Sequence, residues 1–153
     1  SHANTGRMCR NIEPTGQRVL AHIAGDESRH YAFYRTVFAA ILALDPNRAL
    51  QSLQKVTLAF AMPGHNIAGF GDMARVLERA GVFGPRDYSG IVVELLEFWK
   101  IGELTGLSPL GREAQDKVMK VPTRLNRIAD YADAKAQKKT HKFPFIYNRA
   151  LEI

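Results

Sequence analysis

The sequence predicts an all-α fold, and three observations indicate it. Apolar residues recur at helical spacing through most of the 153 residues. Two pairs, at residues 45–46 (Asp-Pro) and 108–109 (Ser-Pro), place a capping side chain directly before a proline, which is a frequent start of a helix. No alternation of strands and helices indicates a parallel sheet. The single cysteine excludes an internal disulfide, and the length fits one domain.

Capping and helix-breaking residues set the boundaries of the expected helices. The first ends at residues 45–46, which also begin the second. The second ends at the Met-Pro-Gly run of residues 62–64, and residues 63–71 form a loop because they hold three glycines and a proline. Gly81 ends the short third helix, and Pro85 opens the fourth. The expected helices cover residues 15–44, 46–61, 72–80, 85–104 and 108–138.

The last quarter of the chain is basic and ends in an expected extended tail. Ten Lys and Arg but only four Asp and Glu lie between residues 112 and 149, so this part carries the whole net charge of +6. The fifth helix is expected to bend near Pro122, and residues 142–153 are expected to be extended. Such a surface suits an acidic partner, either nucleic acid, an anionic membrane or an acidic carrier protein. A solvated helix face is an equally good interpretation, because no nucleic-acid-binding module accompanies the charge.

Several classes of protein are excluded by what the sequence lacks. No apolar run approaches the ~20 residues that span a bilayer, and no targeting peptide is visible, so the protein is expected to be soluble. The glycines of residues 64–71 follow a helix, which argues against a phosphate-binding loop. Neither a Ser-His-Asp arrangement nor a zinc-ligand spacing is present.

Glu27 and His30 are the one pair of residues whose pattern indicates a functional site. The two are three apart and lie on one helix face, roughly 60° from each other. That face is expected to be buried, because apolar residues continue it on both sides. These are Leu20, Ile23, Tyr34, Val37 or Phe38, and Ile41. A buried charge needs a partner or a metal, and Glu-x-x-His directed into a bundle is half of a di-iron site. The spacing leaves a metal site and a hydrogen-bonded pair equally open.

Several short motifs occur together in a characteristic order. They are Ser-His-Ala-Asn-Thr at 1–5, Asp-Glu-Ser-Arg-His at 26–30, Leu-Asp-Pro at 44–46, Met-Pro-Gly-His at 62–65, Trp-Lys at 99–100, Leu-Thr-Gly-Leu-Ser at 104–108, Val-Pro-x-Arg at 121–124 and Phe-Pro-Phe at 143–145. In these motifs the chain resembles, from end to end, the soluble acyl-[acyl-carrier-protein] desaturases. Members of that family are ferritin-like di-iron enzymes of plant plastids and some bacteria. The resemblance implies a ferritin-like helical bundle.

The resemblance also implies roles for particular residues. Glu27 would be an iron ligand that bridges two metals, and His30 a terminal ligand. Asp26 would accept a hydrogen bond from the ligand histidine of a partner motif. Arg29 would pair with buried carboxylates nearby. The segment of Met62 and Pro63 would line the deep part of an acyl channel.

The implied reaction is the insertion of a cis double bond into a saturated acyl chain on acyl carrier protein, in fatty acid biosynthesis. It would use O2, two iron ions and electrons from a ferredoxin. The basic region suits the acidic carrier. A homodimer in the bacterial cytoplasm or the plastid stroma, with no membrane span and no nucleic acid, is the corresponding expectation.

The chain departs from the family in holding one Glu-x-x-His motif where two are needed. The first motif and a further carboxylate are expected before Ser1, in a missing N-terminal half. Residues 1–153 are therefore expected to be the C-terminal part of a larger di-iron domain that cannot complete the site alone. Two alternatives stay open. One is a non-catalytic helical module that binds an acidic partner through its basic face, with Glu27 and His30 as a buried pair. The other is a different ferritin-like di-iron oxidase.

Overall fold

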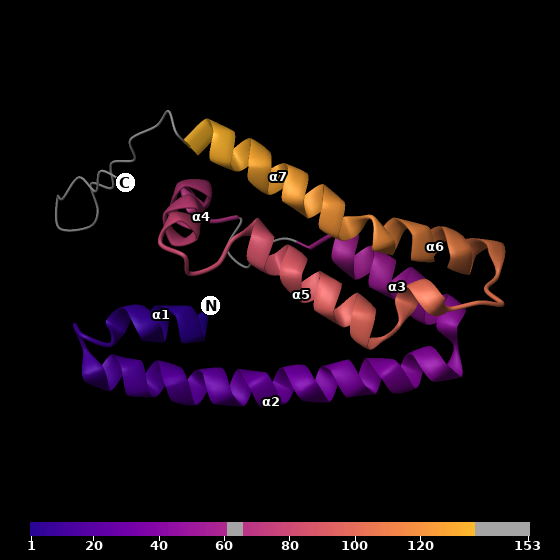
Figure 1. Cartoon of the computed structure of the whole chain (residues 1–153), viewed down its shortest axis with the longest axis horizontal. Helices are drawn as coiled ribbons and strands as arrows, with labels where there is room; N and C mark the ends of the chain where they lie inside the picture. Colours follow the sequence, from indigo (N-terminus) through magenta and orange to yellow (C-terminus); the bar gives the residue numbers. More distant parts are fainter. Residues whose placement is uncertain (61–65, 137–153) are drawn as a thin grey trace.

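A computed structural model describes residues 1–60 and 66–136 (Figure 1). Within these ranges the regular structure is entirely helical, with no strand, which confirms the predicted all-α class. The elements in chain order are α1 (His2–Cys9), α2 (Pro14–Leu44), α3 (Pro46–Leu58), α4 (Phe70–Arg79), α5 (Pro85–Phe98), a 3-10 turn (Ile101–Glu103), α6 (Pro109–Met119) and α7 (Val121–Ala136). None of the described helices is long and apolar enough to cross a membrane.

Side-chain caps begin three of these helices. Glu13 caps α2, where its carboxylate accepts from the backbone N–H groups of Thr15 and Gly16. Asp45 caps α3 by accepting from the Arg48 N–H at 3.0 Å. Ser108 caps α6 by accepting from the Gly111 N–H at 3.1 Å. The two cap-and-proline starts predicted from the sequence are thus confirmed.

The ends of several helices differ from the expectation. The fourth predicted helix ends at Phe98, because Lys100 adopts a left-handed backbone with φ of 51° and a 3-10 turn follows. The expected fifth helix is two helices, α6 and α7, which separate at Lys120, just before Pro122. The second predicted helix ends earlier, at Leu58. The short helix α1 was not predicted. The expected tail of residues 142–153 lies outside the described residues.

The core lies where α3, α5, α6, α7 and the 3-10 turn meet. Leu50, Ile101 and Val118 are its largest fully buried side chains. Helices α3 and α6 pack closely at Gly111, where an added Cβ would overlap the Asn47 carboxamide. Asn47 Oδ1 also accepts a hydrogen bond from the Ser108 N–H at 2.8 Å, so one side chain ties α3 to the start of α6.

Helix α2 is the longest element and runs along one side of the molecule (Figure 1). Its N-terminal half packs against α1, and its C-terminal end joins the core through buried Leu42. Between these two regions the backbones of α2 and α5 do not pack closely, and long side chains bridge them. The middle of α2, which carries Glu27 and His30, is therefore the least enclosed part of the helix.

Candidate metal centre

Glu27 and His30 lie side by side in the middle of α2. The distance from His30 Nδ1 to Glu27 Oε2 is 3.5 Å, and the side chain of His30 is 64% and that of Glu27 57% exposed. That distance is longer than a good hydrogen bond, so the two groups are not firmly held by each other. One carboxylate and one imidazole thus project together from a single open face, and both are free to take another partner.

The expectation that this face is buried is wrong for the described residues. Helix α2 contacts α5 and the core through a neighbouring face, which carries Tyr31, Arg35, Phe38 and Leu42. This face is rotated from the predicted stripe by about 80°. Most of the predicted stripe is consequently exposed, although Leu20 packs against α1 and Phe38 against the core. Its exposed members are Ile23 at 37%, Tyr34 at 67%, Val37 at 38% and Ile41 at 46%.

The alternative in which Glu27 and His30 form a buried pair is wrong for this structure, because both side chains are exposed. Arg29 also differs from the expectation. Its guanidinium pairs with Asp26 on the neighbouring face of α2, where the Arg29 side chain is 74% and that of Asp26 47% exposed. Neither residue contacts a buried carboxylate within the described ranges. The roles suggested for Asp26 and Arg29 stay predictions.

The donors on α2 fit part of an iron site. Within residues 1–60 and 66–136, no group of three or more His, Cys, Asp and Glu side chains could hold a metal ion. Glu27 and His30 are the carboxylate and imidazole that one helix contributes to a di-iron carboxylate site. The chain therefore fits one half of such a site and does not enclose an iron ion by itself.

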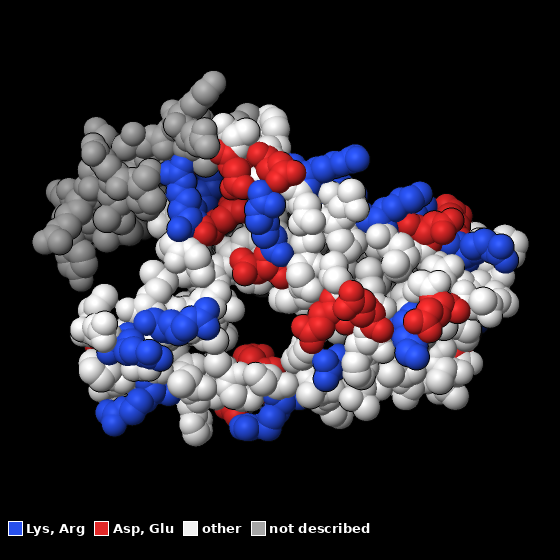
Figure 2. Space-filling view, in the orientation of Figure 1, with Lys and Arg blue, Asp and Glu red and all other residues white. Residues whose placement is uncertain are grey.

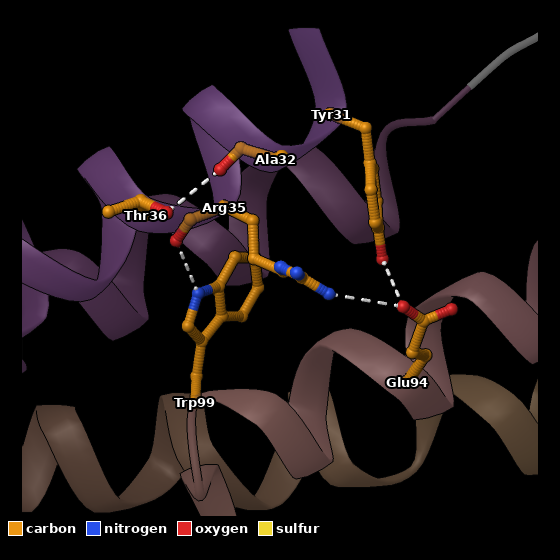
Figure 3. A network of polar contacts seen from close by, with 6 residues as sticks. All are labelled: Tyr31, Ala32, Arg35, Thr36, Glu94 and Trp99. Carbon is orange, nitrogen blue, oxygen red and sulfur yellow. Dashed lines mark hydrogen bonds and ion pairs between the residues drawn. The ribbon is translucent and has the colours of Figure 1, made fainter. Parts of the chain in front are cut away.

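A polar network adjoins the pair on the α5 side (Figure 3). Tyr31 and Arg35 of α2 both donate to Glu94 of α5, and the Trp99 indole donates to the Arg35 carbonyl. Burial raises the pKa of Tyr31, and its hydrogen bond to the Glu94 carboxylate raises it further. This network was not predicted from the sequence. The spacing of Tyr31 and Arg35 was visible, but Glu94 is 59 residues beyond Arg35 and no local pattern joins them.

The expected acyl-channel residues, Met62 and Pro63, lie outside the described residues. Near the ends of the undescribed segment, α4, α5 and α7 line an apolar cavity of about 400 Å³. Phe60 and Tyr88 stack at one side of it, with ring centroids 4.0 Å apart. Glu78 is one of its polar lining residues. Burial and the charge of Asp133 raise the pKa of Glu78.

Comparison with known proteins identifies one family that matches almost the whole chain. The family described as fatty acid desaturase matches residues 1–147. The chain is 33% identical over 163 residues to a chloroplastic stearoyl-[acyl-carrier-protein] 9-desaturase of Gossypium hirsutum, and 37% identical over 168 residues to stearoyl-[acyl-carrier-protein] 9-desaturase 1 of Oryza sativa subsp. indica. Both alignments cover 100% of this chain but only 41% and 43% of the relatives, so the chain spans about two fifths of their length. Because the family match covers nearly every residue and includes the Glu27 and His30 motif, the chain belongs to the fatty acid desaturase family.

Proposed function

We propose that this chain is the C-terminal part of an acyl-[acyl-carrier-protein] desaturase, in which Glu27 and His30 supply one half of a di-iron site. The observation that carries the proposal is the placement of these two ligand-type side chains together on an exposed apolar face of α2. A face of this kind is suited to being covered by further helices. The relatives that the chain matches are named as stearoyl-[acyl-carrier-protein] desaturases, which supports the substrate class.

The packing of α1 on α2 supports a location for further ligands. The two helices are antiparallel, and Gly6 lies against Leu20, where an added Cβ would come within 3.4 Å of the Leu20 Cβ. Because the helices run in opposite directions, each step of one residue upstream of Gly6 in α1 lies beside a step of one residue downstream of Leu20 in α2. A helix that continued α1 upstream would pass beside Glu27 and His30 a few residues before Ser1. We expect a carboxylate ligand there, and a second Glu-x-x-His motif further upstream.

In the complete site, iron would supply the oxidative chemistry with O2 and with electrons from a ferredoxin. The residues of this chain would hold the iron ions and keep water away from them. Glu27 and His30 provide donors from one helix, and Asp26 accepts a hydrogen bond that orients the histidine of the partner motif. The apolar residues around the pair exclude water once covered. Met62 and Pro63 would line the deep end of the acyl channel.

The basic side chains of α6 and α7 support an acidic carrier as the partner. Figure 2 shows Lys and Arg along the edge that these two helices form. Lys117 pairs with Glu113 at 2.6 Å, whereas no ion pair with another described residue holds Lys120, Arg124 or Arg127, all of which are exposed. Exposed cations of this kind attract an acidic protein and speed its association. A homodimer in the plastid stroma or the bacterial cytoplasm is part of the same proposal.

The decisive experiment uses the intact gene product, including whatever precedes Ser1. The purified protein, with iron, ferredoxin and O2, is expected to convert a saturated acyl chain on acyl carrier protein into a cis-monounsaturated one, detected by mass spectrometry. Glu27→Gln and His30→Ala are each expected to abolish turnover with little loss of helix content by circular dichroism, because each removes a metal ligand. His22→Ala, on another face of α2, is the matched control and is expected to remain active.

A different oxidised product would instead indicate another ferritin-like di-iron oxidase, and retained turnover in either ligand variant would contradict the assigned roles. The chain by itself offers a second check. Anaerobic titration of residues 1–153 with Fe(II) is expected to show no tight binding of two irons, because the described residues supply only half of the ligands. Two tightly held irons per chain would overturn the half-site proposal.

A further inference from the structure

The network between α2 and α5 converges on one carboxylate oxygen (Figure 3). Glu94 Oε1 accepts from the Tyr31 hydroxyl at 3.1 Å and from Arg35 Nη1 at 3.3 Å. Tyr31 and Arg35 are one helical turn apart on α2, so two successive turns are tied to the same point on α5. Trp99 at the end of α5 adds a third tie, because its Nε1 donates to the Arg35 carbonyl at 2.9 Å.

Aromatic rings hold the Arg35 side chain in place. Its guanidinium carbon lies 4.2 Å from the centroid of the Phe98 ring and 5.3 Å from that of Tyr31, both cation–π distances. The Arg35 Nε atom is buried and has no hydrogen-bond partner among the described residues. The arginine is therefore fixed by stacking as well as by Glu94, and it is less mobile than an ordinary surface arginine.

This network restrains a part of α2 that little else restrains. The described backbone of α2 packs closely against α1 near its start and against α3 near its end, but not against α5. The orientation of the middle of α2 about its own axis thus depends on the side chains that reach α5. Tyr31 directly follows His30, so any rotation that moves Tyr31 away from Glu94 also moves His30 and Glu27.

We propose that Glu94 is a positioning residue that sets the direction in which Glu27 and His30 point. The proposal rests on the proposed function, because it assumes that the pair binds iron. A rotation of α2 by ~15° displaces atoms at the helix surface by about 1.5 Å. Metal–ligand distances tolerate only about 0.2 Å. Loss of the Glu94 tie would therefore misplace both ligands while the helix itself stays folded.

The test compares Glu94→Ala with Glu97→Ala, an exposed glutamate one turn away on the same helix. Glu94→Gln keeps an acceptor oxygen and serves as the conservative variant. Trp99 is the only tryptophan of the chain, so its fluorescence reports on the network in residues 1–153. Glu94→Ala is expected to increase the quenching of Trp99 by acrylamide relative to wild type. Glu97→Ala is expected to leave the quenching at the wild-type level. Glu94→Gln is expected to bring the quenching most of the way back to that level.

The second measurement uses Fe(II) and the intact gene product. Glu94→Ala is expected to weaken Fe(II) binding about tenfold or more, as the loss of a residue that orients a metal ligand typically does. It should lower kcat with an unchanged KM for the acylated carrier. Fe(II) affinity and kcat in Glu94→Ala equal to those of Glu97→Ala would overturn the positioning role alone. An intact wild-type protein that holds no iron would overturn the proposed function, and the positioning role with it.

Discussion

Gly111 and Gly90 differ at the residue scale in what surrounds them, although both lie inside helices. At Gly111 an added Cβ would overlap the Asn47 carboxamide, which itself accepts a hydrogen bond from Ser108. At Gly90, on α5, nothing lies within 4 Å of an added Cβ and the residue is exposed. Gly111 is required by the close packing of two helices. Gly90 is not required by packing, and it costs α5 the larger conformational entropy that a glycine loses on folding.

Opposite effects are therefore expected from the same substitution at these two positions. Gly111→Ala should lower the free energy of unfolding by about 1–3 kcal/mol, because α3 and α6 must move apart. Gly90→Ala should raise it by about 0.5–1 kcal/mol, because alanine loses less entropy on entering a helix. Urea unfolding followed by circular dichroism measures both. An unchanged or higher stability of Gly111→Ala would contradict the close packing of Asn47 on Gly111.

At the scale of elements, features that depend on residues close together in the sequence could be predicted. Contacts between helices far apart in the sequence could not. The caps at Asp45 and Ser108 were predictable because a capping side chain acts within three residues of itself. The position of Glu27 beside His30 was predictable for the same reason, while their role as metal ligands stays a prediction. The face of α2 that contacts α5 was assigned wrongly, because periodicity locates an apolar stripe but not the element that covers it. Glu94 was missed because its partners lie far away in sequence.

Glu78 provides a prediction about the contact between α4 and the elements beside it. Its pKa is raised above the ordinary 4.5 by burial and by the charges of Asp133 and Asp87, and Arg86 only partly offsets this. The folded state thus binds the proton more tightly than the unfolded state. The contribution of Glu78 to stability is fully present below the ordinary pKa of 4.5 and is lost as the pH rises from there through the raised folded pKa.

Glu78→Gln mimics the protonated side chain and should be more stable than wild type at pH 7. The difference should disappear as the pH falls below about 4.5, where wild-type Glu78 is protonated in both states. Glu113→Gln is the matched control of opposite sign, since the hydrogen bond from Lys117 lowers the pKa of Glu113. Urea unfolding at several pH values measures both, and equal behaviour of the two variants would contradict the burial of Glu78.

At the scale of the whole molecule, the exposed apolar stripe of α2 leaves this chain incompletely covered. Ile23, Tyr34, Val37 and Ile41 lie on one face on either side of Glu27 and His30, and each is at least 37% exposed. Scattered apolar residues are normal on a protein surface, but a contiguous stripe along a long helix marks a contact surface or a tendency to aggregate. In the proposed enzyme the missing helices would cover it.

Residues 1–153 alone are therefore expected to self-associate, with sedimentation velocity showing species larger than the monomer at micromolar concentration. The double variant Ile23→Gln and Val37→Gln should shift the population toward monomer, because it breaks the stripe at two turns while Glu27 and His30 are kept. Val56→Gln is the control, since Val56 is 66% exposed on α3, away from the stripe. If the control variant reduced association as much as the double variant, the contact surface would lie elsewhere. A wild-type chain that stays monomeric at high concentration would show that the stripe needs no cover, and would remove the main structural argument for helices packed over Glu27 and His30.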